Sequence, residues 1–279
     1  MIPSRWRAAA LGATTLIAVV PPAGAAAATG GAAAPVAGTS HGRAAVLSQL
    51  SVSRSRIYAY GAPARVTFEI DSRARTLPVT LDVYSGASRV ASIALGTLAT
   101  GAQHSYALHG EALPSGRLTV RVRTPRLRAR ARAAEILNRD HCFPLAGPFT
   151  WPGAAGRFGA GRPGHVHQGF DLLAAEGTPV VAPRGGTVTT VAYQAAGAGF
   201  YVVLSGAGES YDYAFMHLEA GSVRVHAGQR VATGARIGNV GATGDASGPH
   251  LHFEVWQGPW QAGGRPIDPL PFLRRWLAT

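Results

Sequence analysis

The stretch that decides the fold of the C-terminal half is SGPHLHFEV, from Ser247 to Val255. Polar and apolar residues alternate along it, and successive side chains of a β-strand point to opposite faces. A strand here places His250, His252 and Glu254 on one face and the apolar residues between them on the other. Such imidazoles are either ordinary solvent-facing histidines or members of a site, and partners elsewhere in the chain decide between these interpretations.

The segments before this stretch have the same character. Short runs of strand-forming residues are separated by glycine-rich loops: TPVVAPRGGTVTTVAYQ (178–194), GFYVVLSGAG (199–208), SYDYAFMHLEAGS (210–222) and QRVATGARIGNVG (229–241). No long helix is predicted before LPFLRRWL (270–277). Residues 142–279 are therefore predicted to form an all-β domain of antiparallel hairpins with Gly-rich loops.

The N-terminal half also alternates, in shorter units. The runs are ARVTFEID (64–71), LPVTLDVYSG (77–86), SRVASIALGTL (88–98), HSYALHG (104–110) and GRLTVRVRT (116–124). Several short strands at this spacing predict a β-sandwich, with bounds at residues 50–124. The pattern resembles the immunoglobulin-like accessory modules of secreted proteins, and we assign it no chemistry.

Between the two halves lies PRLRARARAAEILNRDH, residues 125–141. Alternating arginines are followed there by an Ala-rich stretch that permits a helix. We interpret the segment as a basic linker about one helix long. It is a solvated spacer or, alternatively, a contact for an anionic polymer.

The charge is strongly positive, with 26 basic and 14 acidic residues giving a formal net charge of +12, and every basic residue is arginine. Such a chain favours polyanions, but the arginines are scattered and accompany no nucleic-acid-binding signature, so we expect no nucleic-acid partner. The lone Cys142 can form no internal disulfide and is interpreted as a small buried residue.

The N-terminus has the pattern of a secretory signal. Arg5 and Arg7 precede an apolar stretch over residues 8–20, and small residues follow in PPAGAAAA (21–28). Residues 1–25 are predicted to be a signal peptide, and residues 26–49 a flexible leader. The apolar stretch is shorter than the about 20 residues of a membrane-spanning helix, so we expect export to the cell wall, periplasmic space or exterior without a membrane span.

A partner for the paired histidines occurs in HVHQGFDLLAAEGTPV, residues 165–180. His167 and Asp171 are four residues apart and share one side of a strand or of a helical turn. With His252 they supply two imidazoles and a carboxylate, and three such ligands leave zinc an open fourth position, as in catalytic sites. His165 competes for the first place, but its spacing to Asp171 is six, and the pattern H-x-G-x-D starts at His167.

Two further histidines are not needed as ligands. His217 follows a tyrosine-bearing strand, and His250 shares the face of His252, so both are candidates for proton transfer and stabilisation of charge. The sequence does not say which of them takes the proton. Glu254 either orients a histidine from outside the metal shell or is an exposed strand carboxylate.

Four motifs carry a resemblance to a known family. HQGFD (167–171), GTPVVAPRGGTV (177–188), YAFMHL (213–218) and SGPHLHFEV (247–255), in this order, resemble the lysostaphin-like (LytM-type) zinc endopeptidases of peptidoglycan, over residues 143–273. The resemblance implies an antiparallel sheet with the metal in a groove between loops. It also implies zinc ligation by His167, Asp171 and His252, with His217 and His250 lining the reaction site.

The resulting hypothesis is a secreted zinc metalloendopeptidase that hydrolyses stem or cross-bridge peptides of bacterial peptidoglycan, with anionic wall polymers as further partners. One alternative is a non-catalytic wall-binding or amidase-activating module that retains the fold. A weaker one is an adhesin in which the β-sandwich is the working part. The oligomeric state, the bond cut and the role of the sandwich are left open.

Overall fold

The computed structural model describes residues 44–125, 127 and 132–278. Across these residues the chain forms nineteen strands, one short 3-10 helix and one α-helix, which confirms the predicted all-β fold. The predicted signal peptide and most of the predicted leader lie outside the described residues. No helix in the described part combines the length and apolar character required to cross a membrane.

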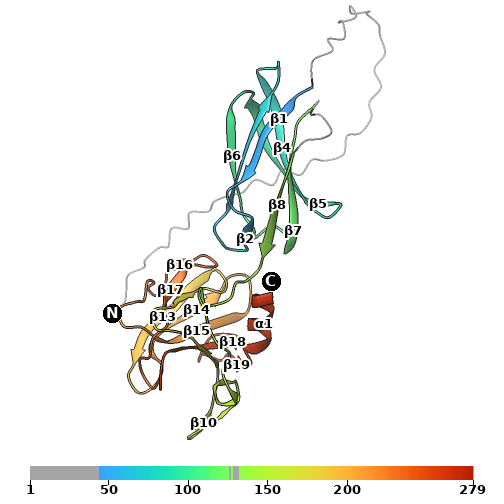
Figure 1. Cartoon of the computed structure of the whole chain (residues 1–279). Coiled ribbons are helices and arrows are strands. Elements are labelled where there is room, and N and C mark those ends of the chain that lie inside the picture. The colour runs from blue at the N-terminus through green and yellow to red at the C-terminus, as the bar shows by residue number, and fades with distance from the viewer. Residues whose placement is uncertain (1–43, 126, 128–131, 279) are drawn as a thin grey trace, which may run out of the picture. The chain divides into compact units, whose positions relative to one another are not determined.

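Eight strands form the N-terminal part (Figure 1). They are β1 (Val46–Val52), β2 (Arg56–Tyr58), β3 (Ala64–Asp71), β4 (Thr76–Ser85), β5 (Ser88–Ala99), β6 (Gln103–Leu108), β7 (Gly116–Arg123) and β8 (Ala133–Arg139). One sheet has the order β1-β3-β6 and the other β2-β8-β7-β4-β5. Phe68 of β3 and Val120 of β7 are both fully buried in one shared core, so the two sheets form a sandwich. Its immunoglobulin-like character stays a prediction.

The sandwich extends beyond the predicted strands at both ends. Strand β1 begins at Val46, within the predicted leader, and β8 occupies Ala133–Arg139, where we expected a helix-length linker. Strand β8 pairs with β7 and β2, and buries Ile136 and Asn138 on its inner face. The linker prediction is therefore wrong for these residues, because pairing with two strands outweighs the helix propensity of an alanine-rich run.

The C-terminal part is a second, larger β-structure. Its elements are η1 (Ala154–Gly156), β9 (Gly161–Arg162), β10 (His165–Val166), β11 (Phe170–Leu173), β12 (Pro179–Val181), β13 (Gly186–Gln194), β14 (Gly199–Gly206), β15 (Tyr211–Leu218), β16 (Arg230–Val231), β17 (Arg236–Asn239), β18 (His250–Gln257), β19 (Arg265–Ile267) and α1 (Leu270–Ala278). Seven strands form one sheet of order β11-β18-β15-β14-β13-β16, with β19 beside β18. All of its pairings are antiparallel, as predicted.

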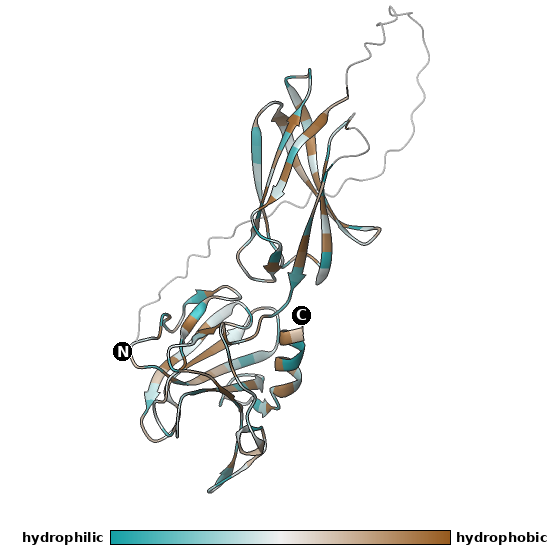
Figure 2. Ribbon diagram, in the orientation of Figure 1, coloured by the Kyte–Doolittle hydropathy of each residue, from teal (hydrophilic) through white to brown (hydrophobic). Residues whose placement is uncertain are grey.

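Alternation along β18 separates a core face from a site face. Leu251, Phe253 and Val255 are fully buried in the main core, where Trp276 of α1 also packs. The residues between them point to the opposite face of the sheet. Figure 2 shows the same alternation of hydrophobic and hydrophilic positions along the strands of both parts. The core therefore fixes which side of β18 presents its histidines.

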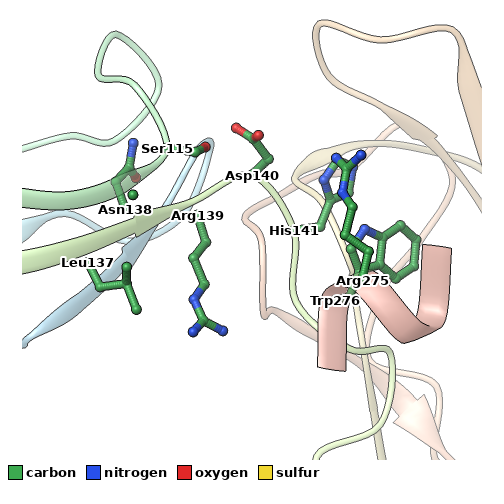
Figure 3. A pocket seen from close by; sticks show the side chains of 9 residues that line it. Ser115, Leu137, Asn138, Arg139, Asp140, His141, Arg275 and Trp276 are labelled. Carbon is green, nitrogen blue, oxygen red and sulfur yellow. The ribbon is translucent and has the colours of Figure 1, made fainter. Parts of the chain in front are cut away.

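His141 is part of this structure, although we predicted it as the end of the linker. Its ring stacks on Trp276 at 5.0 Å between centroids (Figure 3), and its Nε2 lies 3.0 Å from Oε2 of Glu209. The next residue, Cys142, has its thiol 3.3 Å from the carbonyl oxygen of Ala182, and burial raises its pKa to about 11. The thiol is thus unreactive at neutral pH, in line with a structural cysteine.

Candidate metal centre

Pairing of β11 with β18 creates the site. The antiparallel register places Asp171 directly opposite His252. His167 lies three residues before β11, where its backbone N–H donates to the carbonyl of Ala160 at 2.8 Å. Segments 85 residues apart in the sequence are thereby brought into contact.

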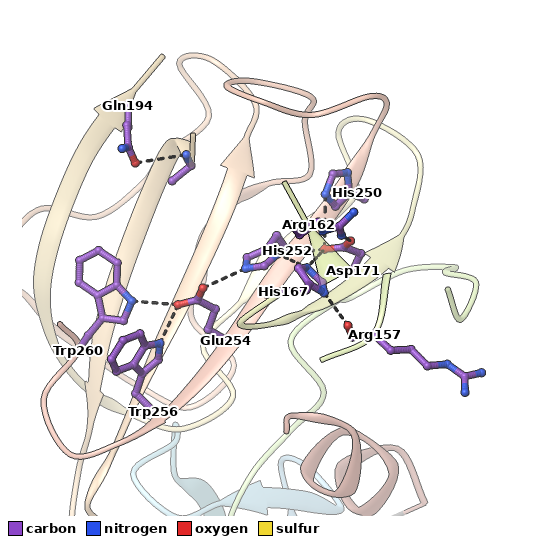
Figure 4. Close-up of polar contacts among 11 residues, drawn as sticks. Arg157, Arg162, His167, Asp171, Gln194, His250, His252, Glu254, Trp256 and Trp260 are labelled. Carbon is purple, nitrogen blue, oxygen red and sulfur yellow. Dashed lines mark hydrogen bonds and ion pairs between the residues drawn. The ribbon is translucent and has the colours of Figure 1, made fainter. Parts of the chain in front are cut away.

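The three side chains proposed as ligands converge on one point (Figure 4). Oδ1 of Asp171 lies 3.0 Å from Nε2 of His167 and 2.9 Å from Nδ1 of His252. The two nitrogens are themselves 2.9 Å apart. His165 is not part of this cluster: it sits on the β9–β10 hairpin, with Nδ1 3.1 Å from the carbonyl oxygen of Pro163.

Outer partners decide which nitrogen of each ring carries hydrogen. Nδ1–H of His167 donates to the carbonyl oxygen of Arg157 at 2.8 Å, and Nε2–H of His252 donates to Oε1 of Glu254 at 3.1 Å. In these tautomers both inward nitrogens are bare acceptors, and the carboxylate between them is also an acceptor. Three lone pairs that face one point repel one another, and a cation between them removes this repulsion.

The donor set fits zinc. Zinc takes histidine nitrogens and carboxylate oxygens at about 2.0–2.2 Å, so tetrahedral ligand atoms stand about 3.3 Å apart. The 2.9–3.0 Å separations found here need only a slight opening. With three ligands among the described residues, the arrangement matches a catalytic centre that keeps one position for water.

Arg162 contacts the carboxylate from the groove side. Its Nη2 lies 3.2 Å from Oδ2 of Asp171, which leaves Oδ1 turned toward the histidines. The sequence alone does not indicate this residue, because nothing in GRPGH (161–165) distinguishes its arginine from the many others. The hairpin of β9 and β10 carries it to the site.

The neighbouring side chains shift the pKa values of Asp171 and His252. Burial alone would raise the pKa of Asp171, but the adjoining imidazoles of His167 and His252 outweigh it and hold that pKa well below its usual range. Burial alone would lower the pKa of His252, but hydrogen bonds to Asp171 and Glu254 raise it to about 9. At neutral pH a proton on His252 thus occupies the place of the cation.

A pH dependence of metal binding follows. Zinc must displace the proton of His252, so its apparent affinity is expected to rise about tenfold per pH unit from pH 7 to about 9 and then to level off. Chelator competition at several pH values measures this, with proton release followed in weak buffer. A zinc affinity that stays constant from pH 7 to 9 contradicts the assignment.

The loop GATGDASGPH (241–250) orients the two remaining histidines. Nδ1–H of His217 donates to the carbonyl of Thr243 at 2.8 Å, and Nδ1–H of His250 donates to that of Gly248 at 2.8 Å. The two rings are 4.7 Å apart, and Nε2 of His250 lies 3.7 Å from Oδ1 of Asp171. Because these hydrogen bonds engage Nδ1, the Nε2 of each histidine is available for proton transfer.

His217 is held in an unusual state. Its backbone φ of 61° lies in the left-handed region, which non-glycine residues adopt at a cost of about 1–3 kcal/mol, usually at functional sites. Burial lowers the pKa of its imidazole to about 4, and the neighbouring His250 and His252 add to the effect. His217 is consequently neutral at neutral pH and suited to accept a proton.

The side chains lie in a groove of about 500 Å³. Its lining is mainly polar and includes Arg162, His165, Gln168, Gln194, Asp245 and Gln261. These residues come from the β9–β10 hairpin, the segment between β10 and β11, the end of β13 and the loops on either side of β18. An extended peptide with polar or charged groups fits such a lining better than an apolar ligand does.

The glycine of HQGFD (167–171) is Gly169, and the space around it explains why it has no side chain. A Cβ at this position would lie 2.6 Å from Nε2 of His252 and 2.7 Å from the carbonyl oxygen of Phe253. We expect G169A to lower the stability of the metal-free protein by about 1–3 kcal/mol and the zinc affinity by about tenfold or more. Thermal unfolding and zinc competition measure the two effects.

Gly153 offers the matched control. A Cβ there meets nothing within 4 Å, and its φ of −62° and ψ of −176° suit alanine. G153A is expected to leave both quantities unchanged. Equal losses in G153A and G169A would show that the close approach of Gly169 to the ring is unimportant.

Part of the chain is similar to known proteins. Residues 165–269 match the model of Peptidase family M23. A metalloprotease of Haemophilus influenzae is 40% identical over 144 residues, 52% of this chain and 26% of the relative. Peptidoglycan DD-endopeptidase ShyA of Vibrio cholerae is 37% identical over 102 residues, 37% of this chain and 22% of the relative. The lysostaphin catalytic domain from Staphylococcus simulans aligns with a TM-score of 0.40 and 29% identity, covering 45% of this chain and 92% of that domain.

Fold and site together define a β-structured domain in which three side chains could hold one metal ion. The match to peptidase family M23 over residues 165–269 lies within the span over which the four motifs resemble the lysostaphin-like endopeptidases. The chain spans about a quarter of the length of the two curated relatives, which are 26% and 22% covered.

Proposed function

We propose that this protein is a secreted zinc metalloendopeptidase that hydrolyses peptide bonds in the stems or cross-bridges of bacterial peptidoglycan. The observation that carries the proposal is the convergence of three bare ligand atoms beside two oriented histidines in a polar groove. Related chains named as peptidoglycan DD-endopeptidases, lysostaphin and glycyl-glycine endopeptidase support the substrate class.

Different residues of the chain would bind the metal and transfer protons. His167, Asp171 and His252 would hold the zinc, which when bound supplies a Lewis acid and lowers the pKa of a coordinated water to about 7. His217 is neutral, and its Nε2 can take a proton from the attacking water. His250, whose Nε2 lies 3.7 Å from Oδ1 of Asp171, can donate a proton to the oxyanion or to the leaving amine.

Location and charge are consistent with this substrate. The predicted signal peptide over residues 1–25 directs the chain to the cell wall, periplasmic space or exterior. The net charge of +12 favours association with anionic wall polymers. The sandwich carries no metal-ligand cluster among the described residues, so we place the chemistry in the C-terminal part.

The test is incubation of the purified protein with sacculi, followed by mass spectrometry of the released muropeptides. New peptide ends are expected. They should be absent when a chelator is present and should return when zinc is added. Defined peptides with glycyl bridges or with D-residue stem bonds then identify the bond. Sacculi that are bound but unchanged under all metal and pH conditions would instead fit a non-catalytic wall-binding or amidase-activating module.

A further inference from the structure

A buried carboxylate lies directly behind the proposed ligand His252. Glu254 is only 4% exposed and shares the site face of β18 with His252. Its Oε1 accepts from Nε2–H of His252 at 3.1 Å (Figure 4). Its Oε2 accepts from two indoles, Nε1–H of Trp256 at 2.7 Å and Nε1–H of Trp260 at 3.0 Å. The exposed-carboxylate interpretation of Glu254 is therefore wrong.

The count of donors and acceptors makes a carboxylate necessary here. The two indole N–H groups at Glu254 can only donate, and Nε2 of His252 donates as well in the tautomer that leaves Nδ1 to the ligand cluster. Only an acceptor at both oxygens satisfies all three, and a buried charge is tolerated when it is fully hydrogen-bonded. We call Glu254, Trp256 and Trp260 the carboxylate clamp. Each hydrogen bond in it restricts the orientation of the two side chains that it joins.

The clamp has a direct consequence for metal binding. A histidine that donates from Nε2 keeps its lone pair on Nδ1, and Nδ1 is the atom that faces Asp171 and His167. Gly169 also lies close to this ring, because a Cβ there would stand 2.6 Å from Nε2 of His252. Carboxylates behind metal-bound histidines fix ring orientation and tautomer in this way.

We propose that Glu254 is a positioning residue of the metal centre, which holds His252 as the Nε2–H tautomer with Nδ1 presented to the metal, and that the indoles of Trp256 and Trp260 hold Glu254 in turn. The inference rests on the proposed zinc site. It assigns to three residues outside the ligand set a role in metal affinity.

Trp260 connects this clamp to the groove. It belongs to the loop between β18 and β19 and contributes to the groove lining together with Gln261. Its backbone N–H donates to Oδ2 of Asp212 at 2.9 Å, and its ring lies 5.7 Å from that of Tyr201. One indole thus forms part of the groove wall and supports the carboxylate behind a metal ligand.

The decisive variant is E254Q, which keeps the size of the side chain. In either orientation of the amide, an NH₂ group replaces one acceptor and faces a donor, either His252 or the two indoles. The His252 tautomer is then no longer enforced, and zinc affinity is expected to fall about 10–100-fold. Chelator competition measures this on the folded protein without any wall substrate, so the result is independent of hydrolysis.

Asp212→Asn is the matched control. Asp212 is also a buried carboxylate, 7% exposed, on the neighbouring strand β15, and its contact with the backbone of Trp260 is one that an amide oxygen can keep. D212N is expected to bind zinc within about twofold of the unchanged protein. A loss confined to E254Q supports positioning. Equal losses in both variants, or wild-type affinity in E254Q, overturn it.

A measurement on the unchanged protein covers the case in which E254Q does not fold. Nitrogen-15 correlation spectra of the zinc-loaded, histidine-labelled chain report the tautomer of each ring. His252 is expected to carry hydrogen on Nε2 and His167 on Nδ1. A bare Nε2 on His252 overturns the proposal, whereas failure to cleave peptidoglycan would leave it standing and overturn only the proposed function.

Discussion

Replacing His252 with alanine is expected to remove zinc binding and hydrolysis together. Its Nδ1 is one of three converging ligand atoms, 2.9 Å from the other two, and His167 is the one other histidine of the cluster among the described residues. Zinc sites of proteins bind with apparent free energies of about 10–16 kcal/mol shared over four ligands. Losing one ligand therefore costs about 2.5–4 kcal/mol, or about two to three orders of magnitude in affinity.

Metal analysis after dialysis and the shift in melting temperature on adding zinc measure this loss. H165A is the matched control, because His165 lies in the same groove but outside the ligand cluster. It is expected to retain about one zinc per chain. If zinc is lost from H250A and retained by H252A, the assignment within HLH (250–252) is reversed.

Much of this site is predictable from local sequence. The alternation in SGPHLHFEV (247–255) places His252 and Glu254 on one face, because apolar residues at every second position fix the buried side of a strand. The four-residue spacing of His167 and Asp171 permits a shared side, although His167 lies before β11 and its backbone is held by the carbonyl of Ala160. Those two rules require only neighbours in the chain.

What the sequence leaves open depends on distant partners. The opposition of Asp171 and His252 comes from the β11–β18 register, and no local pattern encodes which strands pair. The choice between an exposed and a buried Glu254 depends on Trp260, which reaches it from a loop. Strand β8 likewise shows that an alanine-rich run takes the conformation its neighbours impose.

Removing either of the other two histidines is expected to separate metal binding from turnover. H217A and H250A lose no atom of the ligand cluster, so each should retain zinc. Each also removes an Nε2 that is available for the reaction because the backbone carbonyl accepts from Nδ1 of the same ring. A lost general acid–base or oxyanion contribution lowers the rate by about a hundredfold or more. Metal content and initial rates on the same preparations measure both effects.

The two variants differ in what they remove, and the leaving group distinguishes them. A peptide must have its leaving amine protonated as the bond breaks, whereas an ester of the same sequence leaves without that proton. If His250 donates this proton, H250A loses much less rate on the ester than on the peptide. H217A, which lacks the base that activates water, slows both substrates alike. The opposite pattern would exchange the roles of His217 and His250, and full activity in both variants would remove both residues from the mechanism.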